Sequence, residues 1–367
     1  MQKKMAAMIE TVRPGWRQRW RSRLQMLAQR ADPPAAVAPG RAWLCGQGAR
    51  VALDEQQMGP EEAAALALEL EADKGVVALS LALGNRVRAD GAEAIGRALQ
   101  ANTTLVELDL SSNSVGDAGV QALALALAGN SVLQRLVLRR SEIGVAGAEA
   151  LAQALEHGAA LQCLDLSLND VQDTGAAALA RALPRSTCAL TELQLANNGI
   201  GAAGAAALGA ALASGARLTQ LDLADNSLVG CGAIPLAAGL ARNQAMAELR
   251  LGGTDCGDAG VVALANALHT ARGLRVLDLT SNSITRAGAL ALALALQAEP
   301  PLRELRLSDN PAMGVASRRL LTRALATNHT LTTLHMEHDA PAPHLESTMS
   351  ARLAANQVLI VKGLKRI

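Results

Sequence analysis

A repeat of 28 or 29 residues runs through most of this 367-residue chain and constrains its fold more than any other feature. The unit that begins at Leu105 shows the pattern in full, with Leu108 and Leu110 following, then Asn113 and Val115. Nine units begin one period apart, at Leu105, Leu133, Leu161, Leu190, Leu218, Met246, Leu274, Leu302 and Leu331. A fixed period in this range indicates a solenoid, in which stacked repeats share one continuous hydrophobic core.

Each repeat is predicted to form a short strand followed by a helix. The leucines of L-x-x-L-x-L point inward from the strand, and two later leucines, four residues apart, share one helix face. An asparagine after the strand can satisfy backbone groups where the chain turns, and it recurs at Asn113, Asn169, Asn198, Asn226, Asn282 and Asn310. Ser141 and Thr254 replace it in two repeats, where we expect a looser turn.

Two further rows follow from stacking the repeats. The third strand leucine of each unit is predicted to form one buried row: Leu110, Leu138, Leu166, Leu195, Leu223, Leu251, Leu279 and Leu307. A glycine near each helix start indicates close helix packing, where a Cβ would clash: Gly119, Gly147, Gly175, Gly204, Gly232, Gly260 and Gly288.

The pattern resembles the ribonuclease-inhibitor-like subfamily of leucine-rich repeat proteins, on segments such as 105-LVELDLSSNSVGDAGVQALALAL-127 and 274-LRVLDLTSNSITRAGALALALAL-296. The resemblance implies an α/β fold, a right-handed solenoid curved as a horseshoe, with a parallel β-sheet on the concave face and helices on the convex face. Such proteins include ribonuclease inhibitors, Ran GTPase-activating proteins, the sensing regions of NOD-like receptors, and cytoskeletal or ciliary scaffolds. Their functions differ, so the resemblance transfers shape more than activity.

Four segments are predicted along the chain. They are a basic arm with a Pro/Ala-rich linker (1–43), an N-terminal cap (44–75), the repeats (76–339) and a C-terminal cap (340–367). The N-terminal cap is expected to hold a strand near Val51–Leu53 and a helix starting after Gly59-Pro60, since proline and acids favour the first helical turn. The first repeat has one extra residue before Asn85, and the C-terminal cap is expected to contain a helix around Leu345–Ala355.

Charge and cysteine usage bear on location. The net charge is +1, but residues 1–30 hold eight basic residues against Glu10, so they carry 8 − 1 = +7 and the remainder 1 − 7 = −6. Five cysteines without CxxC spacing argue against a disulfide or zinc framework, which favours a reducing, cytoplasmic location. The N-terminus lacks the apolar core of a secretory signal, and no apolar run reaches the ~18 residues that span a bilayer. The sequons at Asn102 and Asn328 are therefore expected to be chance matches.

The basic arm carries a candidate binding segment at residues 15–30. Its tryptophans and leucines fall in one stripe at helical spacing, with arginines around it: Trp16, Trp20, Leu24 and Leu27, beside Arg17 and Arg21 among others. We favour docking on a protein and expect no nucleic-acid partner. Peripheral contact with an anionic membrane, an organelle transit peptide covering residues 1–40, and an unfolded tail remain alternatives.

Strand positions one repeat apart give the other charge pattern. Along one column lie Asp109, Val137, Asp165, Gln194, Asp222, Arg250, Asp278, Arg306 and His335. The four from Asp222 to Arg306 are predicted to form a ladder of alternating charge that stabilises the sheet. The aspartates lie two strands apart, ~9–10 Å. That distance suits an inverting glycosidase, but an open sheet face does not exclude water, so a structural role is favoured.

A local positive spot is predicted on neighbouring strand positions at Arg135, Arg139 and Arg140. It is flanked by Glu107, Asp109 and Asp165, and elsewhere this face is balanced in charge or weakly acidic. Because arginine can hold a carboxylate in a two-pronged contact, the spot is a candidate binding site for an acidic protein surface.

Other motifs point to no catalytic or metal chemistry. The glycines at 199–204 match G-x-G-x-x-G, but Gly201 and Gly204 occupy ordinary repeat positions, and no βαβ unit with a ribose-binding acid follows. The histidines near the end (His329, His335, His338 and His344) are expected to belong to a solvated cap rather than a metal site. No nucleophile or P-loop signature occurs, so neither a cofactor nor enzymatic activity is expected.

These observations favour a non-enzymatic scaffold for protein–protein interaction, as a subunit or adaptor of an intracellular assembly such as a cytoskeletal or ciliary one. The repeats lack aromatic residues, which argues against an inhibitor of very high affinity. A regulator of a small GTPase is an alternative, although Ran GTPase-activating proteins carry an acidic C-terminal segment and this chain ends in basic residues. An immune sensor or effector-type adaptor resembling NOD-like receptors is another, although no nucleotide-binding module precedes the repeats.

Overall fold

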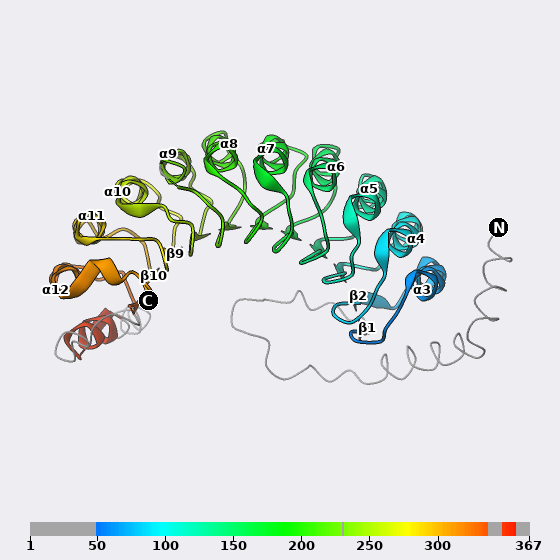
Figure 1. Ribbon diagram of the computed structural model, residues 1–367, viewed down its shortest axis with the longest axis horizontal. Helices are drawn as coiled ribbons and strands as arrows, with labels where there is room; N and C mark the ends of the chain where they lie inside the picture. Colours follow the sequence, from blue (N-terminus) through cyan, green and yellow to red (C-terminus); the bar gives the residue numbers. More distant parts are fainter. Residues whose placement is uncertain (1–48, 230, 337–346, 357–367) are drawn as a thin grey trace, which may run out of the picture. The chain divides into compact units, whose positions relative to one another are not determined.

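Strands and helices alternate along a computed structural model that describes residues 49–229, 231–336 and 347–356 (Figure 1). Two compact units are present. The first ends at Asp165 and includes residues 187–189, and the second comprises Leu166–Ser186 and the chain from Leu190. The first contains β1 (Ala49–Ala52), α3 (Pro60–Ala72), β2 (Val76–Ser80), α4 (Arg88–Ala101), β3 (Glu107–Asp109), α5 (Gly116–Leu127), β4 (Arg135–Val137), α6 (Val145–Glu156) and β5 (Cys163–Asp165).

The second unit continues the alternation. It contains α7 (Gln172–Ala182), β6 (Glu192–Gln194), α8 (Ala202–Ala213), β7 (Gln220–Asp222), α9 (Ala233–Arg242), β8 (Glu248–Arg250), α10 (Gly257–Ala267), β9 (Val276–Asp278), α11 (Arg286–Gln297), β10 (Glu304–Arg306), a 3₁₀ turn η1 (Pro311–Met313), α12 (Gly314–Ala324) and β11 (Thr333–His335). Residues 347–356 are also helical, within the region where a C-terminal helix was predicted.

Within each unit the strands pair in parallel and in chain order. In the first unit Leu108 lies opposite Leu136, and in the second Leu221 lies opposite Leu249 and Leu249 opposite Leu277. This register keeps the repeats in phase, so each inward leucine stacks on its equivalent. The helices of a unit lie on one side of its strands (Figure 1). We call the other side the open face. The predicted α/β fold class, a parallel sheet alternating with helices, is confirmed.

The predicted leucine row is also confirmed as a buried row. All eight third-strand leucines have no exposed surface: Leu110, Leu138, Leu166, Leu195, Leu223, Leu251, Leu279 and Leu307. Each follows the last strand residue, where the chain turns toward the helix, so its side chain enters the space between the two layers. Burying a leucine side chain contributes ~1.5–3 kcal/mol.

The asparagine after the strand forms the predicted ladder of buried hydrogen bonds. Asn226 Nδ2 donates to the carbonyl of Leu195 in the preceding repeat (2.8 Å) and to that of Leu223 in its own (2.9 Å). Its Oδ1 accepts the amides of Asn198 (3.0 Å) and Ile200 (2.9 Å). With a longer bond to the Ala224 carbonyl (3.3 Å), one side chain thus bonds five backbone groups and joins consecutive turns. Asn113 and Asn310 bridge their neighbours similarly, and Asn85 does so despite the extra residue before it.

The two repeats without this asparagine behave differently. Ser141 keeps the link to the preceding repeat, because its hydroxyl donates to the Leu110 carbonyl (3.2 Å). The Thr254 hydroxyl lies 2.8 Å from the Leu251 carbonyl in its own turn and 2.8 Å from Asn282 Oδ1, and these two acceptors share its one proton. The Leu228 amide bonds instead to the Thr254 backbone carbonyl (2.9 Å). A threonine side chain lacks the amide oxygen with which asparagine accepts this bond, so the backbone carbonyl of Thr254 accepts it instead.

A second asparagine ladder, which the sequence analysis did not anticipate, lies before the strands. Asn102 Nδ2 donates to the Leu70 carbonyl at the end of the previous helix (2.6 Å), and its Oδ1 accepts the Leu105 amide (2.8 Å). Asn328 makes the same pair of contacts to Leu296 and Leu331, at 2.8 Å each. Asn102 is only 2% exposed and Asn328 is fully buried, so neither sequon is accessible for glycosylation.

Close packing accounts for the glycine near the helix start. At Gly119 a Cβ would lie 2.7 Å from Val115 Cγ1 and 3.0 Å from Ala92 Cβ on α4, too close for any other residue without movement. Cys256 is 2% exposed, and burial raises the pKa of its thiol to about 11. It is therefore a neutral packing residue at physiological pH.

Candidate protein-binding surface

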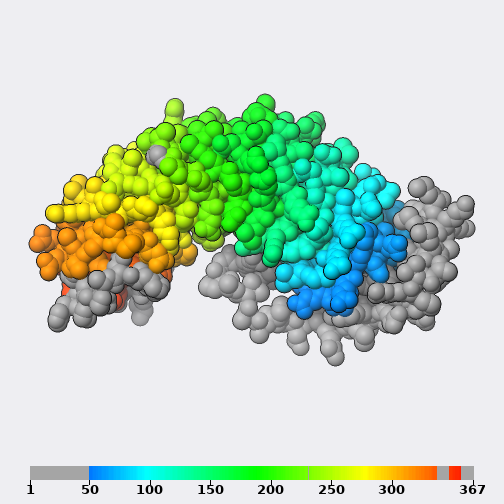
Figure 2. All heavy atoms as spheres, viewed as in Figure 1, coloured from blue at the N-terminus to red at the C-terminus, as the bar shows by residue number. Residues whose placement is uncertain are grey.

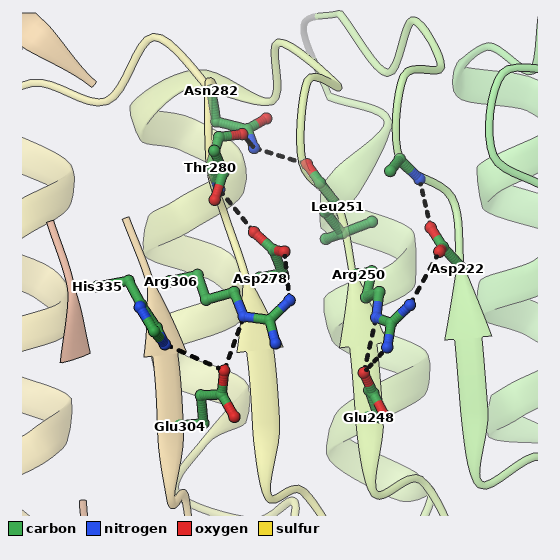
Figure 3. A network of polar contacts seen from close by, with 11 residues as sticks. Asp222, Glu248, Arg250, Leu251, Asp278, Thr280, Asn282, Glu304, Arg306 and His335 are labelled. Carbon is green, nitrogen blue, oxygen red and sulfur yellow. Dashed lines mark hydrogen bonds and ion pairs between the residues drawn. The ribbon is translucent and has the colours of Figure 1, made fainter. Parts of the chain in front are cut away.

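The open face of the second unit carries the charge ladder, and its arginines are paired within the sheet (Figure 3). Arg250 lies 3.5 Å from Asp222 and 2.6 Å from Glu248. Arg306 lies 3.3 Å from Asp278 and 2.7 Å from Glu304. His335 Nε2 approaches Glu304 Oε1 at 3.3 Å.

The predicted ladder is therefore present as two paired groups. Sequence reasoning missed Glu248 and Glu304, which precede each arginine by two residues and so share its face of the strand. Because each arginine already has two carboxylates, this part of the open face offers no free positive charge to a partner.

The aspartates of this column accept hydrogen bonds from the backbone just after each strand ends. Asp222 Oδ1 accepts the Ala224 amide (2.9 Å), Asp278 Oδ1 accepts the Thr280 amide (3.0 Å), and Asp109 Oδ1 accepts the amide and hydroxyl of Ser111. A carboxylate that bonds the amide two residues on stabilises the turn where a strand ends. These contacts support the structural role that the sequence analysis favoured.

Asp109 differs from the other two in its surroundings. Burial raises the pKa of its carboxyl, the hydrogen bonds from Ser111 lower it, and the charges of Asp54 and Asp165 raise it further, so the net shift is upward. Among the described residues, no group of histidines, cysteines and carboxylates has an arrangement that could hold a metal ion. In the first unit this column holds two carboxylates, Asp109 and Asp165, and Asp165 is only 2% exposed.

The three arginines of the predicted positive spot fall into two environments. Arg135, on β4, is half-buried, and its Nε lies 3.2 Å from Glu107 Oε1 on β3. Arg139 and Arg140 are exposed, and neither makes an ion pair with another described residue. Both lie in the turn after β4 and not on the strand as predicted, because β4 ends at Val137 and Arg140 adopts a φ of 52°.

Turn residues of the first unit carry further arginines that the sequence analysis overlooked. Arg86 lies in the turn after β2 and Arg88 is the first residue of α4; both are exposed and make no ion pair with another described residue. The turns after β2, β3 and β4, taken with this first helical residue (82–88, 110–115 and 138–144), carry four arginines and one carboxylate, Glu142. Since parallel strands end at the same edge of a sheet, these turns lie along one edge. We call the four arginines (Arg86, Arg88, Arg139 and Arg140) the basic turn edge.

The equivalent turns of the second unit have the opposite sign. Within residues 166–171, 195–200, 223–229, 251–256, 279–284 and 307–312 there is no Lys or Arg, and four exposed aspartates occur: Asp170, Asp225, Asp255 and Asp309. Comparing the same turn positions across repeats would have found this contrast in the sequence. A comparison of strand positions alone could not have found the contrast, because the strands carry both acidic and basic residues.

The remaining sequence motifs have structural positions. In the 199–204 motif the Gly201 and Gly204 amides donate to Asp173 Oδ1 at 2.7 and 2.8 Å, so a carboxylate of the preceding helix occupies this glycine turn. His329 approaches Glu299 at 3.7 Å. His338 and His344 lie outside the described residues, as do Trp16, Trp20, Arg17 and Arg21 of the basic arm.

Comparison with known proteins identifies the repeats. A family model described as "Leucine Rich repeat" matches residues 101–124, 129–152, 160–180, 188–209 and 272–293. The chain is a leucine-rich repeat protein. Each match spans a strand, the turn after it and most of the following helix, the segments whose asparagines, glycines and leucines carry the buried contacts above. No curated protein sequence matches this leucine-rich repeat protein.

Several solved structures are similar to it. An internalin from Listeria monocytogenes shares 17% identity, covering 83% of this chain and 84% of that chain with a TM-score of 0.47. The Rad7 and Elc1 complex in yeast gives 17% identity, 79% and 76% coverage and a TM-score of 0.48. The tropomodulin C-terminal domain of Caenorhabditis elegans gives 18% identity, 37% and 81% coverage and a TM-score of 0.33. In the described part of this chain, no helix is both long and apolar enough to cross a membrane.

Proposed function

We propose that this leucine-rich repeat protein is a non-enzymatic scaffold that binds an acidic protein surface through its basic turn edge. The observation that carries the proposal is the state of the arginines. Those of the strands are engaged by carboxylates, as at Arg250 and Arg306, whereas Arg139 and Arg140 are exposed and make no ion pair with a described residue. A free guanidinium can form a two-pronged contact with a partner's carboxylate without first breaking an internal pair.

The charge of the turns supports a footprint confined to the first unit. An acidic surface is attracted by the four arginines of the basic turn edge. Asp225 and Asp255, at equivalent turns of the second unit, would repel it. The basic arm, at +7 over residues 1–30, would add to the attraction through Arg17 and Arg21 beside Trp16 and Trp20. The finer form of the proposal, a place in a cytoskeletal or ciliary assembly, rests on the subfamily resemblance alone.

Charge reversal tests the proposal. Full-length protein and the Arg139→Glu/Arg140→Glu variant would each be used to recover partners from the source cells, and binding of each recovered protein would be titrated at low and high salt. The matched control is Arg319→Glu/Arg323→Glu, which makes the same charge change at two exposed arginines of α12.

We expect a partner with an acidic surface whose affinity falls at least tenfold in the first variant, mainly through slower association, and is unchanged in the control. Loss of salt dependence should accompany the weaker binding, because the affected contacts are ionic. Equal binding by wild type and Arg139→Glu/Arg140→Glu, with or without residues 1–43, would refute the proposed site and direct attention to the helices.

A further inference from the structure

The outer surface of four consecutive helices in the second unit, α8 to α11, lacks the charge that a solvent-facing helix normally carries. A surface helix usually buries one apolar stripe and exposes charged and polar residues on the opposite side. In these four helices the charged residues are Arg242, Asp258 and Arg286. Arg242 is the last residue of α9, Arg286 the first of α11, and Asp258 bonds the amides of Thr285 and Gly288. The middle of this surface therefore carries no charge.

Large apolar side chains cross this surface in register. Ile234 on α9, Val262 on α10 and Leu290 on α11 lie 28 residues apart, at the same place in consecutive repeats, and are 42%, 39% and 44% exposed. Leu294, one turn further along α11, is 57% exposed. The other outward positions are mostly alanines, as at Ala203, Ala210, Ala238 and Ala287. We call this surface the uncharged helix face. It spans the part coloured from green to yellow in Figure 2.

Among the described helices, α4 and α12 differ clearly, whereas α5 in the first unit has a single charged residue, Asp117, which accepts the Gly144 and Gly147 amides as Asp258 accepts those of Thr285 and Gly288. Helix α4 in the first unit carries Arg88, Asp90, Glu93 and Arg97, with Arg97 and Glu93 forming an exposed ion pair at 3.6 Å. Helix α12, which follows α11, carries three arginines. A helix middle without charge also occurs in α5 and α7, so the uncharged helix face is distinguished by large apolar side chains that recur at one position of three consecutive helices.

The size of the face reaches the lower end of the area that one partner buries in a stable protein interface. Its helices have 10 to 12 residues, so each is ~15–18 Å long. At ~8–10 Å between neighbouring axes, four helices cover roughly 600 Å². A monomer seldom exposes an apolar patch larger than ~300–600 Å², and each partner in a standard interface buries ~800 Å².

We propose that the uncharged helix face binds the same face of a second copy of this chain, forming a two-fold symmetric dimer. A symmetric interface places one patch against itself, so any charge in its centre would meet a like charge. This face has none there, and it offers no charge pattern that would select a different protein. The row of Ile234, Val262 and Leu290 is a ridge that can lie over the alanine-lined spacing between helices of the copy. An anionic membrane surface fits less well, because Asp225 and Asp255 precede α9 and α10.

Light scattering after size-exclusion chromatography, with sedimentation velocity over a wide concentration range, tests the proposal on the full chain. Wild type should approach twice the chain mass of 37.8 kDa as concentration rises. Ile234→Glu/Leu290→Glu should remain at one chain mass, because four charges would be buried in the dimer. Ala238→Arg, which adds one long charged side chain at an exposed alanine of α9, should weaken the dimer at least tenfold.

The matched control is Leu125→Glu. Leu125 is a leucine of α5 in the first unit, 75% exposed and outside the uncharged helix face, so its variant should dimerise like wild type. Circular dichroism melting curves establish that each variant is folded. A wild type that stays at one chain mass throughout, or a dimer that survives both Ile234→Glu/Leu290→Glu and Ala238→Arg, overturns the proposal. The proposal is also overturned if these variants lose binding to lipid vesicles or to another protein but still dimerise like wild type.

Discussion

Replacing Asn226 with alanine should destabilise the second unit more than any surface substitution. The change removes four hydrogen bonds of 3.0 Å or shorter, two donated to the carbonyls of Leu195 and Leu223 and two accepted from the amides of Asn198 and Ile200, and one longer bond to the Ala224 carbonyl. The side chain is 4% exposed, so water cannot replace these partners without opening the turn. At ~1 kcal/mol for each bond, four bonds give about 4 kcal/mol.

The measurement is the urea midpoint of unfolding by circular dichroism, together with hydrogen exchange of the Asn198 and Ile200 amides. Asn266→Ala, at an exposed position of α10, is the control and should change stability by less than ~0.5 kcal/mol. Asn226→Thr should cost about half as much as the alanine, because the hydroxyl can still bond within its own turn, as Thr254 does. Equal midpoints for Asn226→Ala and Asn266→Ala would show that the ladder does not hold the turns together.

Three further predictions concern the core and two carboxylates. Leu223→Ala should cost about 2–5 kcal/mol, measured by urea unfolding, because Leu223 is fully buried. Burial and neighbouring charges raise the pKa of Asp109, so the folded state binds its proton more tightly and stability falls as pH rises through that pKa. Asp109→Asn should therefore raise the melting temperature at pH 7, but not at a pH below the ordinary aspartate pKa. The control Asp222→Asn loses a contact with Arg250 and should not raise the melting temperature. Burial raises the pKa of Asp258, but the hydrogen bonds from Thr285 and Gly288 lower the same pKa by more, so the net shift is downward. The stability that Asp258 contributes is therefore lost as the pH falls through this lowered pKa. Asp258→Ala should cost about 1 kcal/mol at pH 7 and less in acid, by thermal melting.

The fold could be predicted from the sequence because its cause is periodic. A leucine at Leu110 and another at Leu138 carry the same information about a buried position, so an error at one repeat is corrected by the others. The asparagine ladder was predictable for the same reason. The ladder at Asn102 and Asn328 was not, because that position holds asparagine in some repeats and other residues elsewhere.

The candidate site was less predictable because charge pairing depends on side-chain direction. The column of residues one repeat apart correctly placed Arg250 beside Asp222, since neighbouring strands align equivalent positions. It missed Glu248, which pairs with Arg250 along the same strand. It also grouped Arg135 with Arg139 and Arg140, although Arg135 pairs with Glu107 and the other two lie beyond the strand end. A three-residue strand is too short for residue spacing alone to locate its end.

The turns after the strands are suited to carry binding specificity because their backbone does not depend on the residue they hold. The same turn position has φ near +55° at Ser112 (59°), Arg140 (52°), Leu168 (60°), Asn197 (52°) and Asp225 (55°), although these side chains share no chemistry. Non-glycine residues adopt this conformation only where the surroundings impose it, and here a buried polar side chain bonds the backbone of the turn, an asparagine in most repeats and Ser141 beside Arg140. The side chain at this position is then free to be basic in the first unit and acidic in the second. A substitution such as Arg140→Glu should for that reason alter what the turn binds without altering how it folds.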